Sequence, residues 1–151
     1  SSPLASSLAQ RTKAFTQPKR FRQPRQHPSP IVLVVDDDAD SLVLISYVLE
    51  QFKCSFFCET NGQAALELAY RLKPELIVLD IRLPGLSGLE VVKALRRDRS
   101  TDSTPVIAVT AMARLWDQEM AIRAGCSQYL SKPYLIEDMT RLLSCYLTPN
   151  V

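Results

Sequence analysis

The sequence predicts an α/β domain in which a parallel sheet of five strands is covered by helices on both faces. Short apolar runs alternate with segments whose apolar residues recur at helical spacing. This alternation indicates parallel strands joined by helical crossovers. The hydrophobic fraction of 46% is ordinary for a globular protein. We therefore expect a core that needs no disulfide or metal to hold it together.

Five short segments are expected to form the strands. Three of them, Ile31–Val35, Leu76–Leu79 and 106–109, are uninterrupted apolar runs. Such runs are typical of strands that are buried on both faces of a sheet. The segments 54–58 and Gln128–Ser131 predict two further short strands. No internal repeat interrupts this order.

Five helices are expected between and after these strands. Helical spacing runs from Leu42 to Phe52, from Ala64 to Leu72 and from Leu89 to Leu95, and the last two helices are expected over 114–124 and 135–147. Gly125 stands where a helix commonly has its C-terminal cap. Pro74 should stop the second helix just before it, because proline disfavours helical backbone in the preceding residue.

Residues 1–30 differ in composition from the rest of the chain. They contain six basic residues, no acidic residue and five prolines, whereas the remaining 121 residues have 12 basic and 16 acidic residues. We therefore expect a basic, proline-rich tail or linker over 1–30 and a folded domain over 31–151. A solvated linker is the favoured interpretation of the tail. Contact with nucleic acid or another acidic partner is the alternative.

The four cysteines favour a reducing, cytoplasmic location. Cys54 and Cys58 lie in an aromatic stretch, where a free thiol behaves as a small apolar side chain. The only histidine, His27, lies in the tail, and the cysteine spacings do not fit a zinc site. The apolar runs are far shorter than the ~20 residues that span a bilayer, so no membrane partner is expected.

Polar side chains follow the apolar strands at the point where each strand ends. They are Asp36, Asp37 and Asp38 after the first strand, Asp80 after the third, Thr110 at the end of the fourth and Lys132 after the fifth. The carboxyl ends of parallel strands meet at one edge of the sheet, where ligands bind in folds of this class. Carboxylates that lie so close together repel one another and call for a cation. Oxygen ligands suit Mg²⁺ or Mn²⁺.

This set of groups indicates chemistry on phosphoryl groups. A carboxylate held beside a metal ion and an ammonium group can attack phosphorus, and Thr110 could hydrogen-bond to the attached group. Each residue alone also has an ordinary interpretation, as a helix cap, a strand end or an exposed cation. The joint pattern favours the phosphoryl-accepting site.

Four motifs carry a resemblance to a known family. Val-Val-Asp-Asp at 34–37, Leu-Asp-Ile-Arg-Leu-Pro-Gly-Leu-Ser-Gly at 79–88, Val-Thr-Ala at 109–111 and Ser-Lys-Pro at 131–133 resemble the signatures of receiver domains of bacterial two-component systems. The resemblance covers 31–147. It implies a flavodoxin-like, doubly wound (βα)5 fold with strand order 2-1-3-4-5, and a phosphorylated signalling module that is not an enzyme.

The resemblance also implies roles for single residues. Asp80 matches the phosphoacceptor. Asp36 and Asp37 match the acidic pair that binds Mg²⁺ together with Asp80, Asp37 being the favoured direct ligand, and the backbone carbonyl of Arg82 matches a further metal ligand. Asp38 would then open the first helix, where a carboxylate favours the helix dipole.

A second group of residues matches the family's response to phosphorylation. Lys132 matches the phosphate-binding lysine, and Thr110 and Tyr129 match the pair that switches the surface formed by the last two helices and the last strand. The side chains of Arg82 and Met112 are expected to border the path of the hydrolytic water. The implied partners are a histidine kinase or phosphotransfer protein as donor and an effector protein or domain as output.

Two other functions use some of the same residues. A phosphatase of the haloacid-dehalogenase kind has an aspartyl nucleophile and Mg²⁺, but it also has a second aspartate two residues later, where this sequence has Arg82. A degenerate receiver that only binds partners is disfavoured because every member of the acceptor set is present.

Overall fold

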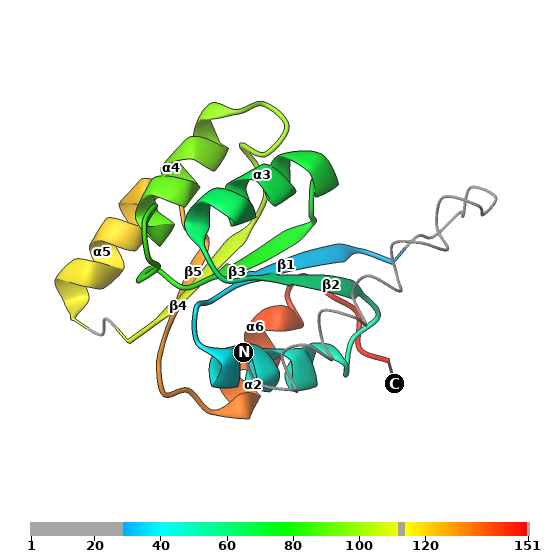
Figure 1. Ribbon diagram of the computed structural model, residues 1–151. Helices are drawn as coiled ribbons and strands as arrows, with labels where there is room; N and C mark the ends of the chain where they lie inside the picture. Colours follow the sequence, from blue (N-terminus) through cyan, green and yellow to red (C-terminus); the bar gives the residue numbers. More distant parts are fainter. Residues whose placement is uncertain (1–28, 112–113, 151) are drawn as a thin grey trace.

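The computed structural model describes residues 29–111 and 114–150, and all structural statements concern these residues (Figure 1). Five parallel strands form one sheet: β1 (Ile31–Val35), β2 (Ser55–Glu59), β3 (Leu76–Leu79), β4 (Val106–Thr110) and β5 (Gln128–Ser131). Their order is β2-β1-β3-β4-β5. The predicted fold class and strand order are confirmed. The expectations about the tail up to residue 28 and about Met112 lie outside the described residues.

Five helices connect and follow the strands: α2 (Ala39–Leu49), α3 (Gly62–Leu72), α4 (Gly88–Arg97), α5 (Leu115–Ala124) and α6 (Ile136–Leu143). In Figure 1, α3, α4 and α5 cover one face of the sheet, and α2 and α6 cover the other. Each face has its own apolar cluster, with the strands contributing alternate side chains to the two clusters. The sheet is therefore buried on both faces, as its continuous apolar runs predict.

Several element boundaries differ from the sequence-based expectation. β2 begins one residue later, at Ser55, because Ser55 pairs with Ile31 and donates its N–H to the Pro30 carbonyl at 2.9 Å. β4 extends to Thr110, which pairs with Ser131 of β5. α2 ends before Phe52, which instead forms an isolated bridge with Pro149.

The last helix is shorter than expected, because it ends at Leu143 and not at residue 147. The following N–H groups of Cys145 and Tyr146 donate to carbonyls three residues back, at 3.1 and 2.9 Å. The helix thus tightens into turns, although Leu147 still lies in the core at 5% exposure.

Local signals fix several helix ends. Asp38 caps α2 by accepting the Ser41 N–H, so the expected role of Asp38 at this helix start is confirmed. Ser87 and Glu90 form a reciprocal capping box at the start of α4. Gly125 caps α5 with a φ of 121°, a backbone conformation that favours glycine. Within the described ranges, no helix has the length and apolar character needed to span a membrane.

Candidate functional site

The backbone of the sheet brings the predicted site residues to one edge. Asp80 donates its N–H to the Val35 carbonyl at 2.9 Å, which places it beside the residues that follow β1. Lys132 donates its N–H to the Thr110 carbonyl at 2.9 Å, which joins the ends of β5 and β4 in the same way. The ends of four parallel strands therefore deliver their side chains to a common site.

Three carboxylates meet at this edge. One oxygen each from Asp36, Asp37 and Asp80 lies within 4.8 Å of the others. Asp36 and Asp80 are each only 6% exposed, whereas Asp37 faces solvent. This donor set consists of oxygen atoms, two of them buried and one open to solvent, which is the arrangement that Mg²⁺ favours when it keeps several waters. The residues present therefore fit the metal ion that the sequence predicts.

Lys132 bridges two of the three carboxylates. Its Nζ lies 2.7 Å from Asp36 Oδ2 and 3.2 Å from Asp80 Oδ2. Burial is the largest influence on the pKa of Lys132 and lowers it, but the two carboxylates together outweigh burial and hold this pKa above its ordinary value. For Asp36, burial prevails over Lys132, and its pKa is raised. Lys132 is therefore a fixed cation inside the site.

The loop after β3 holds the other oxygen of Asp80. Asp80 Oδ1 accepts the Arg82 N–H at 3.0 Å, while the Arg82 side chain is exposed to solvent. Gly88 lets this loop close tightly, because a Cβ atom there would meet the Asp80 carbonyl oxygen at 2.5 Å. Asp36 Oδ1 is held in the same way, by the Asp38 N–H at 2.9 Å. Both buried carboxylates are thus oriented by backbone.

Thr110 and Tyr129 lie on the same face of the sheet. Ala108 pairs with Tyr129 and Thr110 with Ser131, and paired residues in parallel strands point to the same face. Thr110 is fully buried at the end of β4. The Tyr129 hydroxyl is shielded from solvent and has no hydrogen-bond partner among the residues that the structure describes. The edge of the sheet that carries Asp36, Asp80 and Lys132 is called the acceptor edge below. Thr110 and Tyr129 are therefore close to this edge and pack on the α3–α4–α5 side.

Sequence reasoning missed one buried charged residue on this side. Asp117 lies in the first turn of α5, and its side chain is only 3% exposed. Its Oδ2 pairs with Arg114 Nε at 3.2 Å, and its Oδ1 is buried without a partner. Spacing of three residues from Arg114 suggests an ordinary surface ion pair on a helix. No sequence signal distinguishes the buried Asp117 from an aspartate in such an exposed ion pair.

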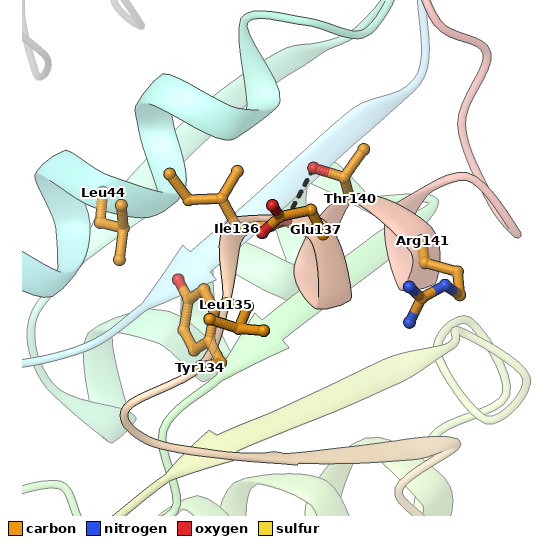
Figure 2. A pocket seen from close by; sticks show the side chains of 7 residues that line it. All are labelled: Leu44, Tyr134, Leu135, Ile136, Glu137, Thr140 and Arg141. Atoms are coloured by element: carbon orange, nitrogen blue, oxygen red, sulfur yellow. Dashed lines mark hydrogen bonds between the residues drawn. The ribbon is translucent and has the colours of Figure 1, made fainter.

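A groove opens on the other side of the site. Figure 2 shows its lining, which comes from α2, from the turn after β5 and from α6, and includes Leu44, Tyr134, Leu135 and Ile136. A second hollow shares Leu44 and Tyr134 with it and reaches Lys132. Leu135 is 65% exposed and Ile136 42% exposed. An apolar surface therefore runs from the acceptor edge along the α2–α6 side.

Comparisons with known proteins agree with this geometry. Polar-differentiation response regulator DivK of Brucella anthropi is 38% identical over 116 residues, which make up 77% of this chain and 94% of that protein. Chemotaxis protein CheY4 of Vibrio cholerae is 25% identical in sequence, with a TM-score of 0.73 over 80% of this chain and 100% of CheY4.

The receiver domain of a sensor histidine kinase from Pseudomonas aeruginosa, whose crystal structure has a magnesium ion coordinated in the active-site cleft, is 28% identical. Its TM-score is 0.72 over 79% of this chain and 98% of that domain. The family model of the response regulator receiver domain matches residues 32–144. This chain belongs to the response regulator receiver domains of two-component signalling.

Proposed function

We propose that this receiver domain accepts a phosphoryl group on Asp80 and thereby switches a surface that binds a partner. The observation that carries the proposal is the placement of the Asp80 carboxylate between a fixed ammonium group, Lys132, and two further carboxylates, Asp36 and Asp37. A nucleophilic carboxylate with charge-stabilising groups aimed at the same point is what phosphoryl transfer requires.

Asp36, Asp37 and Asp80 would hold Mg²⁺ or Mn²⁺, with the backbone carbonyl of Arg82 as the further ligand that the family resemblance implies. The bound ion would offset the negative charge of the phosphoryl oxygens. The three carboxylates carry more negative charge than Lys132 can balance, which supports a bound cation.

In the proposed reaction, one carboxylate oxygen of Asp80 bonds to the phosphorus of a phosphohistidine on the donor protein. The phosphorus–nitrogen bond breaks, and the electron pair of that bond returns to the donor imidazole. Lys132 would neutralise one phosphoryl oxygen, since its Nζ is already within 3.2 Å of Asp80 Oδ2. The product is an acyl phosphate on Asp80, and the protein is the acceptor of the group and not a turnover enzyme.

The donor is proposed to be a histidine kinase or phosphotransfer protein that docks beside the site. The apolar groove of Figure 2 supports this, since it presents Leu135 and Ile136 to a partner and shares Leu44 with the hollow that Lys132 lines. An amphipathic helix that carries the phosphohistidine fits such a groove, because its apolar face would cover these side chains.

The output is proposed to follow from Thr110 and Tyr129. Attraction of the Thr110 hydroxyl to the phosphoryl group would free space for the Tyr129 ring, which lies on the same face of the sheet. The affected surface would comprise α5, β5 and α6, and the effector would bind there. We propose a cytoplasmic location, which the four free cysteines support. A role of the basic tail in binding nucleic acid stays a prediction.

The proposal is tested by incubation with acetyl phosphate and Mg²⁺, followed by mass spectrometry. One acid-labile phosphoryl group is expected on the wild type and none on Asp80→Asn. Asp102→Asn is the matched control, because Asp102 is exposed and outside the site. An adduct that maps to Asp38 or Asp117 would overturn the assignment. A wild type that stays unmodified would instead favour a receiver that only binds partners, and continuous release of phosphate from a phosphomonoester would favour the phosphatase.

A further inference from the structure

Two buried polar atoms on the α5 side of the sheet lack partners. They are Oδ1 of Asp117 and the hydroxyl oxygen of Tyr129, and no other buried side-chain nitrogen or oxygen among the described residues is in this condition. A buried polar group without a hydrogen bond costs free energy, because it has lost its water and gained nothing in return. Both atoms therefore favour any rearrangement that gives them a partner.

The two groups are chemically complementary and belong to elements that contact each other. A phenol donates a hydrogen bond and a carboxylate oxygen accepts one. α5 and β5 are in contact, so the helix that carries Asp117 lies against the strand that carries Tyr129. Burial raises the pKa of Tyr129, and the charge of Asp117 raises it further, so the carboxylate acts on this ring across the helix–strand contact.

The two ends of α5 differ in how many side-chain hydrogen bonds hold them. At its C-terminal end, the Gly125 carbonyl accepts Nε and Nη2 of Arg96 at 3.1 and 2.8 Å, and Arg96 Nη1 also binds the Thr101 carbonyl. At its N-terminal end, no side chain caps the helix. Arg114, which pairs with Asp117 there, is itself 79% exposed. The Asp117 end is therefore the less constrained end.

We propose that Asp117 is a positioning residue of the switch, whose carboxylate accepts a hydrogen bond from the Tyr129 hydroxyl in the switched state. This inference rests on the proposed function, because movement of Thr110 toward a phosphoryl group is what would release the Tyr129 ring. The bond would join the N-terminal end of α5 to β5, and it would give each of the two unpartnered atoms a hydrogen-bond partner. It is absent in the arrangement described above, so it would stabilise the switched state selectively.

The test is a double-mutant cycle on the affinity for beryllofluoride, a mimic of the phosphoryl group, in the presence of Mg²⁺. Fluorescence of Trp116, the only tryptophan of the chain, reports binding. Asp117→Ala and Tyr129→Phe should each weaken binding on the order of tenfold, the value expected for loss of one hydrogen bond to a charged group. The double variant should be no weaker than either single variant, because both remove the same bond.

Two further variants separate the hydrogen bond from the charge and the fold. Asp117→Asn keeps an acceptor oxygen and should recover most of the affinity that Asp117→Ala loses. If Asp117→Ala does not fold, Asp117→Leu, which also lacks an acceptor, completes the cycle. Asp102→Ala is the control, since Asp102 is exposed and lies outside both the site and the surface formed by α5, β5 and α6. It should bind beryllofluoride as the wild type does.

Additive losses in the double variant would overturn the proposal, and so would an Asp117→Ala variant that binds as tightly as the wild type. A coupling of the same size in thermal unfolding without beryllofluoride would also contradict it, since the bond would then belong to both states. Failure of the proposed function looks different, because wild type and Asp80→Asn would then respond to beryllofluoride equally.

Discussion

The molecule contains two regions with buried carboxylates. The carboxylate oxygens of the two regions differ in how many hydrogen-bond and ion-pair partners they have. At the acceptor edge, Asp36 and Asp80 each accept one backbone N–H and share the ammonium group of Lys132. At the contact of α5 with β5, Asp117 has one exposed arginine as partner, and its second oxygen and the Tyr129 hydroxyl have none. Each carboxylate oxygen of Asp36 and Asp80 therefore has a partner, whereas two polar atoms of the second region have none among the described residues.

This difference follows from the elements that carry the residues. Asp36 and Asp80 follow the central strands β1 and β3, whose ladders fix their positions, so the two carboxylates are preorganised. Asp117 lies on a surface helix with one weakly held end. Under the proposed function, charge added at the rigid site would be read as movement at the α5–β5 contact.

The largest expected effect is at the rigid site. Lys132→Met should lower the rate of phosphorylation by acetyl phosphate by at least about 100-fold, because it removes a positioned cation from the transition state. Lys93→Met serves as the control, since Lys93 is exposed on α4. A similar rate in both variants would mean that the bridge between Lys132 and the two carboxylates is only structural.

The next effect concerns the metal ion. Mg²⁺ at about five times its Kd should stabilise the wild type by about 1 kcal/mol through linkage. Asp37→Asn should lose most of this gain, whereas Asp40→Asn, which alters an exposed residue just inside α2, should keep it. Thermal unfolding with and without Mg²⁺ measures both. If the wild type is indifferent to millimolar Mg²⁺, these carboxylates do not share a metal site.

A smaller, severalfold effect is expected on the lifetime of the phosphorylated state. Arg82 has an exposed side chain next to Asp80 and is expected to obstruct the water that hydrolyses the acyl phosphate. Arg82→Asn should therefore lose phosphate faster after the donor is removed, while Arg97→Asn on α4 should not. Longer retention in Arg82→Asn would reverse the interpretation and make the arginine a catalytic group.

The smallest effect concerns pH at the second region. The pKa of Tyr129 is raised above its ordinary value of 10.0, first by burial and then by Asp117. The contribution of the Tyr129 hydroxyl to the free energy of unfolding is fully present below pH 10. It is lost as the pH rises through the higher pKa that this hydroxyl has in the folded state. Tyr129→Phe should lose less stability than the wild type across this range, and Asp117→Asn should show an intermediate loss. Tyr47→Phe is the exposed control and should follow the wild type in chemical denaturation.

The acceptor edge could be predicted from the sequence because its functional residues lie directly at the ends of the predicted strands. Each of these residues ends or directly follows a predicted strand, so parallel pairing alone brings Asp36, Asp80, Thr110 and Lys132 together. The strand order came from the family resemblance and was confirmed. The end of α6 was placed four residues too late, because apolar spacing continues through turns that still pack on the core.

The α5–β5 contact was not predictable in the same way. Burial of Asp117 depends on how the first turn of α5 packs against the sheet, and its sequence pattern matches an exposed ion pair with Arg114. The missing partner of the Tyr129 hydroxyl is likewise a property of packing and not of spacing. Tertiary contacts set both, and a local pattern contains no information about them.

The most direct test of the account is amide hydrogen exchange of the wild type before and after phosphorylation of Asp80. The account predicts that exchange changes most in α5 and β5, including residues 115–124 and 128–131, with a further change in α6. Asp80→Asn under the same conditions should show none of these changes. Phosphorylation that alters exchange only around α3, and leaves α5 and β5 as they were, would contradict the link between the two regions.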